Sequence, residues 1–203
     1  TNEKKNILFS LPVKSILVVD LNPENMDANL EATCDALYKM ACDVNNALYY
    51  QYHASMEEQC QSAYSYELKK KKYVFHSETV IQLLYKEFPL RETEADYFLL
   101  PGGPNKFEEN IVIEVKHPTS NALPKPRLQL FSYLHAGPSN NNPLMSNIRY
   151  GILLMWPTQS NPTMTDDGKY AVLPNPAPKP IMELWKTTNK TTRHKFELLK
   201  KWE

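Results

Sequence analysis

The sequence predicts an α/β (α+β) fold, with a central mixed β-sheet flanked by helices and an N-terminal helical extension. The first observation behind this prediction is a helical stripe of apolar residues within 23–50. The second is a series of short apolar stretches at 95–100, 111–116 and 150–155, with one further helical segment at 126–136 between the last two. Strands that alternate with helices in this way are typical of a sheet covered by helices.

Length and composition favour a single domain. The chain has 203 residues, of which 42% are hydrophobic and 11% aromatic, enough to bury a sizeable core. Lys+Arg and Asp+Glu balance at 23 each, so any basic surface must be local. The three cysteines have no Cys-x-x-Cys spacing, which disfavours a disulfide framework or a zinc site. We find no signal-peptide pattern and no apolar run of ~20 residues, and we expect a soluble, intracellular (cytoplasmic or nuclear) protein with no membrane association.

Two helices are predicted before residue 70. Asn22-Pro23-Glu24 indicates a helix start, with proline at the first helical position and an acid in the first turn. A second helix starts at Ser55, with Glu57 and Glu58 in its first turn. The apolar stripe of the first helix is formed by Met26, Leu30, Cys34, Leu37, Ala41, Val44 and Leu48. We expect this stripe to face the core, or alternatively a protein partner or a second copy of the chain through the helix at 23–50.

The segment after these helices is predicted to form a short strand and a third helix. The strand is Tyr73-Val74-Phe75, Ser77 is the expected N-cap of the helix, and Pro89 stops the helix. Glu78 then lies in the first helical turn, where a negative charge is favourable. The expected apolar side consists of Val80, Ile81, Leu84, Tyr85 and Phe88.

The most informative part of the sequence is a pair of apolar strands that carry charged side chains. Asp96 lies in the strand at 95–100, and Glu114 and Lys116 lie in the strand at 111–116, with a Gly- and Pro-rich turn between them. Two strands joined in this way are expected to pair antiparallel, which would bring Asp96 towards Glu114. Because strand side chains alternate, Glu114 and Lys116 share one face, about 7 Å apart, while the apolar neighbours face the core.

The second half of the chain predicts one helix, three strands and a final helix. The helix runs from Pro126 to a cap at Gly137 and places Gln129 and Tyr133 four residues apart on one face. A buried strand is expected at 150–155 and another near 181–185. Between them, a hairpin turn at Asp166-Asp167-Gly168 leads into a third strand at 169–173. The final helix is predicted from Thr191 or Thr192, with its inward side chains at Phe196, Leu199 and Trp202.

An aspartate and a glutamate on adjacent strands form a hard oxygen site of the kind that Mg²⁺ or Mn²⁺ prefers. A lysine two residues beyond the glutamate can orient an attacking water or stabilise a pentavalent phosphate. Taken alone, x-Glu-x-Lys on a strand is more often a solvated face. The aspartate on its own apolar strand and the later Gln-x-x-x-Tyr helix favour a site instead.

Residues 78–155 resemble the core of the PD-(D/E)xK nuclease superfamily, the restriction-endonuclease-like phosphodiesterases. The matching residues are Asp96, Glu114 and Lys116, although Ala95 stands where the family has proline. Gln129 to Tyr133 is similar to the Gln-x-x-x-Tyr motif of the RecB-like branch, and 150–153 resembles the strand that follows it in type I restriction-subunit relatives. Residues 1–70 and 156–203 match nothing in this family. We expect one domain with a mainly helical part at 1–70, a catalytic core at 71–156, and a C-terminal hairpin and helix at 157–203.

In this family an acid from the first core helix often completes the site, and two placements are possible here. Glu78 is the first choice, since Ser77-Glu78 precedes an apolar segment. The interval to Asp96 is short, however, so the helix at 55–69 is the alternative, with Glu57, Glu58 or Glu67 as the acid. A lone histidine near a helix start, such as His76, is more often a surface residue than a metal ligand. His117 is expected to have a structural role.

The resemblance implies a nuclease that hydrolyses phosphodiester bonds, with DNA favoured over RNA. Asp96, Glu114 and the Val115 carbonyl would bind Mg²⁺ or Mn²⁺, Lys116 would act on water or phosphate, and Gln129 and Tyr133 would orient the site. A local basic surface is expected from Lys69, Lys70, Lys71, Lys72, Lys125 and Arg127. The rival interpretations are a degenerate nuclease-like fold that binds nucleic acid or protein, and the endonuclease domain of a larger effector, mobile-element or viral protein.

Overall fold

A six-stranded mixed sheet forms the centre of the computed structural model, in the order β1-β2-β3-β4-β7-β8. The structure describes residues 26–51, 56–85, 88–117, 124–137, 140, 142–188 and 195–203. The helices are α1 (Ala28–Leu48), α2 (Met56–Lys70) and α3 (Pro124–Ala136). The strands are β1 (Phe75–Tyr85), β2 (Phe88–Leu99), β3 (Ile111–Lys116), β4 (Tyr150–Met155), β5 (Thr163–Met164), β6 (Ala171–Val172), β7 (Ile181–Thr187) and β8 (Phe196–Trp202).

The strands that carry the predicted acids lie in the middle of this sheet. β2 pairs antiparallel with β3, as predicted, and β3 pairs in parallel with β4. The parallel pair requires a crossover, which α3 supplies. On the far side, β7 and β8 continue the sheet with antiparallel pairs. The mixed sheet that the sequence predicts is therefore confirmed.

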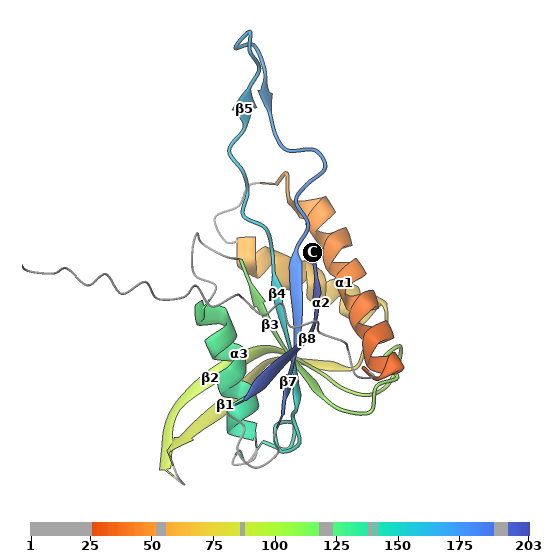
Figure 1. Cartoon of the computed structure of the whole chain (residues 1–203), viewed down its shortest axis with the longest axis vertical. Helices are drawn as coiled ribbons and strands as arrows, with labels where there is room; N and C mark the ends of the chain where they lie inside the picture. The colour runs from red at the N-terminus through yellow and green to blue at the C-terminus, as the bar shows by residue number, and fades with distance from the viewer. Residues whose placement is uncertain are drawn as a thin grey trace, which may run out of the picture.

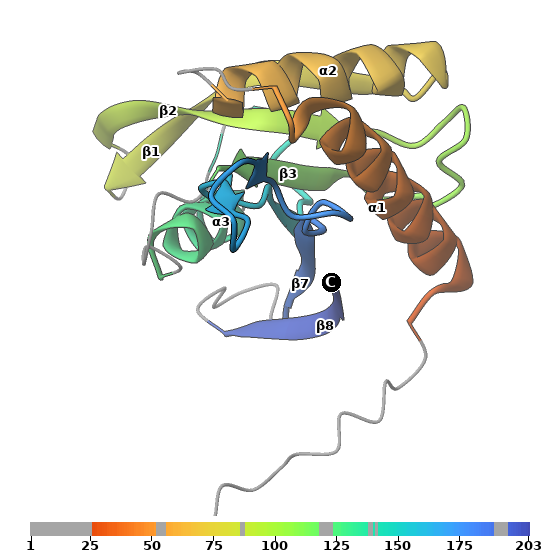
Figure 2. The same ribbon diagram turned by 90° about the horizontal axis from the view of Figure 1, so that it is seen from above.

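Helices cover both faces of the sheet, and α1 and α3 lie on opposite sides of it (Figure 2). Along β3, Ile111, Ile113 and Val115 pack in the core beneath α1 and α2, whereas Val112 packs beneath α3. Both faces of this strand are thus buried. The charged residues that share the Val112 face emerge from the core itself, at the end of the strand, and do not form a solvated face.

The stripe on the first helix faces the core of the protein. Leu30, Cys34 and Leu37 are among its fully buried residues. Asp27 caps the helix, since its Oδ1 accepts hydrogen bonds from the main-chain N–H groups of Asn29 and Leu30. The helix therefore begins after Asp27. The predicted start at Asn22-Pro23 lies outside the described residues. Because the stripe is buried, it is not a free surface for a partner.

The predicted helix after Ser77 is wrong, because residues 75–85 form the strand β1. β1 pairs antiparallel with β2 from Phe75↔Leu99 to Tyr85↔Phe88. The predicted strand at 73–75 overlaps it only at Phe75. Exposed Val80 and buried Ile81 fit strand alternation, although their spacing with Leu84 also fits a helix. Cross-strand hydrogen bonds to β2, which no local pattern reports, decide between the two.

The predicted C-terminal helix is also wrong, because residues 196–202 form the edge strand β8. The register with β7 shifts at Leu184/Trp185, so that Leu198 pairs with Trp185 and Lys200 with Leu184. Leu199 is left between these pairs as a bulge, and it packs with Trp202 against the core beneath α1. The bulge produces an apolar spacing of three residues, which the sequence analysis took for a helix.

Close packing of α3 on β4 depends on Gly151. A Cβ at this position would lie 2.9 Å from Leu130 Cδ1 and 3.2 Å from Leu134 Cδ1, closer than side chains tolerate. The missing side chain lets α3 approach the sheet, and this approach carries the Gln129 and Tyr133 pair towards β3.

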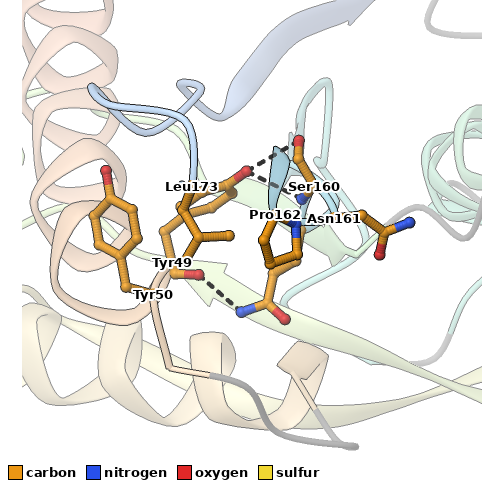
Figure 3. Close-up of a pocket in the computed structure, with 7 residues that line it drawn as sticks. Tyr49, Tyr50, Ser160, Asn161, Pro162 and Leu173 are labelled. Atoms are coloured by element: carbon orange, nitrogen blue, oxygen red, sulfur yellow. Dashed lines mark hydrogen bonds between the residues drawn. The ribbon is translucent and has the colours of Figure 1, made fainter. Parts of the chain in front are cut away.

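An arm leaves the sheet after β4 and ends in the hairpin of β5 and β6 (Figure 1). This confirms the predicted hairpin around Asp166-Asp167-Gly168. A pocket of about 300 Å³ lies between the end of α1 and the base of the arm (Figure 3). Its polar groups already bond across this junction: Gln159 Nε2 donates to the Tyr49 carbonyl at 2.8 Å, and Tyr50 donates to the Pro174 carbonyl at 2.8 Å. These contacts fix the arm to α1.

Candidate active site

Asp96 and Glu114 come together where the pairing of β2 and β3 ends. The last regular pair is Tyr97↔Ile113. Beyond this pair, a side chain replaces a main-chain carbonyl as hydrogen-bond acceptor, because Asp96 Oδ2 accepts the Val115 N–H at 2.6 Å. The side chain is therefore anchored to the strand that carries Glu114.

Glu114 is a buried carboxylate with an incomplete set of partners. Its side chain is 0% exposed. The ammonium of Lys116 lies 2.6 Å from Oε1 as its ion-pair partner. Within the part of the chain that the structure describes, Oε2 has no hydrogen-bond donor. A buried carboxylate oxygen without a hydrogen-bond partner is costly.

The charges of this site are out of balance. Burial, followed by the negative charge of Asp96, raises the pKa of Glu114 to about 7. Burial also raises the pKa of Asp96, although the Val115 N–H and Lys116 oppose the change. Burial alone would lower the pKa of Lys116, but the Glu114 carboxylate raises it well above its usual value. A permanent ammonium thus faces two acids that are short of positive charge, an arrangement that suits a divalent cation.

This imbalance predicts a pH-dependent cost to stability in the metal-free protein. The native state holds the Glu114 proton more tightly than the unfolded chain does, so the free energy of unfolding should fall as pH rises from about 4.5 to about 7. Glu114→Gln should remove this loss and be more stable than wild type at pH 8, by on the order of 1 to 3 kcal/mol. Urea denaturation at pH 5 and pH 8 with a chelator measures it. Exposed Glu92→Gln is the control, and equal pH dependence of wild type and Glu114→Gln would contradict the prediction.

The first turn of α2 supplies a second acid beside Lys116. Glu57 Oε2 accepts the His117 N–H at 2.9 Å, and its Oε1 lies 3.5 Å from Lys116 Nζ. This is the alternative placement from the sequence analysis. Of the other two acids considered on this helix, Glu58 lines a polar pocket that also includes Asp96, and Glu67 pairs with Lys70 at 3.5 Å.

Glu78 is close to Asp96, but from a strand and not from a helix. The pairs Ser77↔Tyr97 and Thr79↔Ala95 flank it, so it stands across from Asp96, with a φ of 51°. A glutamate rarely adopts this left-handed conformation, which interrupts the ladder at this point. Glu78 and Asp96 contribute to a polar pocket of about 180 Å³. Its full lining is Glu58, Gln61, Ser62, Ser65, Ser77, Glu78, Asp96 and Tyr97.

The Gln129 and Tyr133 pair acts as one unit, as their spacing predicted. Gln129 Nε2 donates to the Tyr133 hydroxyl at 2.6 Å, and this hydroxyl donates to the Glu94 carbonyl at 2.8 Å. Burial, followed by the charge of Glu114, raises the pKa of Tyr133 to about 12. Tyr133 therefore remains a neutral donor beside Glu114.

The predicted basic residues are not gathered at the site. Lys69 to Lys72 are exposed at the end of α2, about 18 Å along the helix from Glu57 at 1.5 Å per residue. Arg127 forms a two-point ion pair with Glu183, at 2.9 Å and 2.5 Å, and lies 5.7 Å from the Trp185 ring. Lys125 is exposed near the start of α3. Contact between these six residues and nucleic acid therefore stays a prediction.

His76 is a surface residue, as the sequence favoured, and the structural role expected for His117 stays a prediction. His76 is exposed on β1, and the main chain of His117 bonds to Glu57. Over the described residues, no group of three or more His, Cys, Asp or Glu side chains is arranged to hold a metal ion. The hard oxygen site therefore consists of two carboxylates, with Glu57 on the other side of Lys116.

A comparison with protein families matches residues 31–161 to the PD-(D/E)XK nuclease superfamily. The match covers more than half of the chain and includes Asp96, Glu114 and Lys116. The chain belongs to the PD-(D/E)XK nuclease superfamily. Comparisons with curated proteins and with solved structures gave no match. None of the helices in the described part of this superfamily member is long and apolar enough to cross a membrane.

One contact in this PD-(D/E)XK protein was missed by the sequence analysis. Gln61 Nε2, from the second turn of α2, donates to Asp96 Oδ1 at 3.0 Å. The available signal was its spacing of four residues from Glu57, which places both side chains on one helix face. That signal became interpretable only once α2 was known to pack against the end of β2 and β3.

Proposed function

We propose that the protein is a metal-dependent nuclease that hydrolyses phosphodiester bonds in nucleic acid, with DNA preferred over RNA. The observation that supports this best is the buried, partly unsatisfied carboxylate of Glu114 beside Asp96. The preference for DNA rests on the likeness of Gln129 to Tyr133 to the RecB-like motif, which remains part of the proposal.

The donor set fits a hard divalent cation. Asp96, Glu114 and the main-chain oxygen of Val115 would hold Mg²⁺ or Mn²⁺, and water and substrate phosphate would complete the coordination. The bound metal would polarise the phosphate and lower the pKa of a bound water. The Lys116 ammonium lies 2.6 Å from Glu114 Oε1 and partly neutralises the negative charge of the two acids.

The other side chains have distinct proposed roles. Lys116 donates to the attacking water or to a phosphate oxygen, where a fixed charge stabilises the transition state. Glu57 holds the end of β3 that carries Lys116, and it is the helix acid that we favour. Glu78 lies across from Asp96, in the pocket that the two residues share. Gln129 and Tyr133 support Glu114 and orient the site, because their hydroxyl and amide are already joined to each other.

The test is an activity panel on the full chain. Single- and double-stranded DNA and RNA, linear and circular, are incubated with Mg²⁺, with Mn²⁺ or with a chelator. We expect cleavage that requires the metal, and cutting of closed circles would indicate endonuclease action. Cleavage that persists in chelator, or no cleavage of any substrate, would contradict the proposal.

A second candidate function is a degenerate nuclease-like module that binds nucleic acid or protein. The close ion pair of Lys116 with Glu114 favours this alternative, and so does the finding that no three His, Cys, Asp or Glu side chains among the described residues are arranged to hold a metal ion. Titration calorimetry with Mn²⁺ separates the two functions. Binding that disappears in Asp96→Ala supports the nuclease, whereas absence of such binding in wild type supports the module.

A further inference from the structure

We propose that Gln61 is a positioning residue that orients the Asp96 carboxylate for metal binding. The inference rests on the proposed nuclease function and adds a residue to it. Gln61 would not touch metal or substrate. It would act through Asp96, as hydrogen-bonded neighbours of metal ligands generally do.

The first observation is that both oxygens of Asp96 are held from opposite sides. Oδ1 accepts from Gln61 Nε2 at 3.0 Å, and Oδ2 accepts from the Val115 N–H at 2.6 Å. Two bonds from different elements, α2 and β3, fix the carboxylate plane. Each carboxylate oxygen has two lone-pair directions, so one on each oxygen stays available for a cation.

The second observation is that Gln61 is itself held in place. The main-chain carbonyl of Gln61 accepts a hydrogen bond from the Tyr97 hydroxyl at 2.7 Å. The Ser65 hydroxyl donates to the same Tyr97 hydroxyl at 3.3 Å. Tyr97 is 2% exposed and follows Asp96 directly in β2. The main chain and the side chain of Gln61 thus bond to two successive residues of β2, which leaves its amide little freedom to turn away.

The third observation is that α2 reaches both acid-bearing strands with one face. Glu57 bonds the chain at the end of β3 through His117, and Gln61, one turn later, bonds Asp96 on β2. The beginning of α2 therefore sets the positions of the two strand ends relative to each other. The separation of the metal ligands depends on this relative position.

A neutral donor is chemically suited to this position. Asp96 already stands near Glu57, Glu78 and Glu114, whose negative charges act against its ionised form. A further carboxylate would add repulsion, and an ammonium would compete with the metal for the same oxygen. An amide N–H supports the ionised carboxylate without either effect.

The experiment measures Mn²⁺ affinity by titration calorimetry on the full-length chain. Gln61→Met keeps the length of the side chain and removes the donor, and we expect it to weaken Mn²⁺ binding by roughly 10- to 100-fold. Gln61→Asn keeps an amide one methylene too short, and the same direction is expected. The matched control is Gln159→Leu, which removes an amide that braces the arm at the Tyr49 and Gln51 carbonyls, away from the acids.

A second measurement keeps the contact testable without metal. In the metal-free protein, denaturation of Gln61→Met, Asp96→Ala and the double variant should give effects that do not add, because each substitution removes one partner of the same hydrogen bond. Additive effects, unchanged Mn²⁺ affinity in Gln61→Met, or an equal loss in Gln159→Leu would each overturn the inference. If wild type binds Mn²⁺ and Gln61→Met binds it equally well, the inference alone fails. If wild type shows no Asp96-dependent binding, the proposed function fails and the positioning role fails with it.

Discussion

Replacing Lys116 by alanine is expected to abolish Mn²⁺-dependent cleavage, a loss of at least ~10³-fold, while the protein stays folded. The Lys116 side chain is 23% exposed, and its ammonium lies 2.6 Å from Glu114 Oε1. The ammonium can therefore reach both Glu114 and a substrate phosphate. The fold should persist because the carboxyl of Glu114 can take up a proton, given that burial already raises its pKa to about 7. Asp96→Ala should have the same effect on cleavage, because it removes the second carboxylate.

The measurement is cleavage of a labelled substrate, with circular dichroism to verify the fold of each variant. Lys169→Ala is the matched control, since this lysine is exposed in the turn between β5 and β6 and should keep wild-type activity. Undiminished cleavage in Lys116→Ala or in Asp96→Ala would refute the proposed mechanism.

Arg127→Ala is expected to destabilise the protein by about 3 to 5 kcal/mol. Its partner Glu183 is 1% exposed, and loss of the two-point ion pair leaves a buried carboxylate whose remaining donor is the indole of Trp185, at 3.0 Å. This effect on the core is larger than the removal of a surface cation would produce. It also gives Arg127 a structural role in place of the phosphate contact that its charge suggested.

Urea denaturation measures this change, and Lys125→Ala, exposed on the same helix, is the control that should stay within about 0.5 kcal/mol of wild type. The double variant Arg127→Met/Glu183→Leu should recover most of the lost stability, because apolar side chains can replace a buried ion pair. If Arg127→Ala is as stable as wild type but binds nucleic acid more weakly, Arg127 is a substrate contact after all.

Local patterns in the sequence were sufficient for the acid-bearing strands and the α3 pair. Asp96 and Glu114 lie in apolar stretches that are joined by a Gly- and Pro-rich turn, and both features act over a few residues. Gln129 and Tyr133 are one helical turn apart, so their hydrogen bond follows from helix geometry alone. In these places the chemistry is set by neighbours in sequence, which is why it could be predicted.

The same kind of pattern failed where an apolar spacing fits two structures. Val80, Ile81 and Leu84 suit one side of a helix, yet β1 forms because β2 offers cross-strand partners along most of its length. Phe196, Leu199 and Trp202 are three apart in a strand with a bulge at Leu199. In both cases the deciding hydrogen bonds come from another strand, and spacing within the segment carries no information about them.

By itself, the sequence determined the two acids, the lysine and the strands that carry them, because burial and turn preferences are local. Only the tertiary structure decided which side chains surround them. It brings Glu57 to Lys116 and Gln61 to Asp96, places Glu78 opposite Asp96 on a strand, and turns Arg127 inward to Glu183. These contacts join residues that are 18 to 59 positions apart, so they exist only after the helices and strands have packed together.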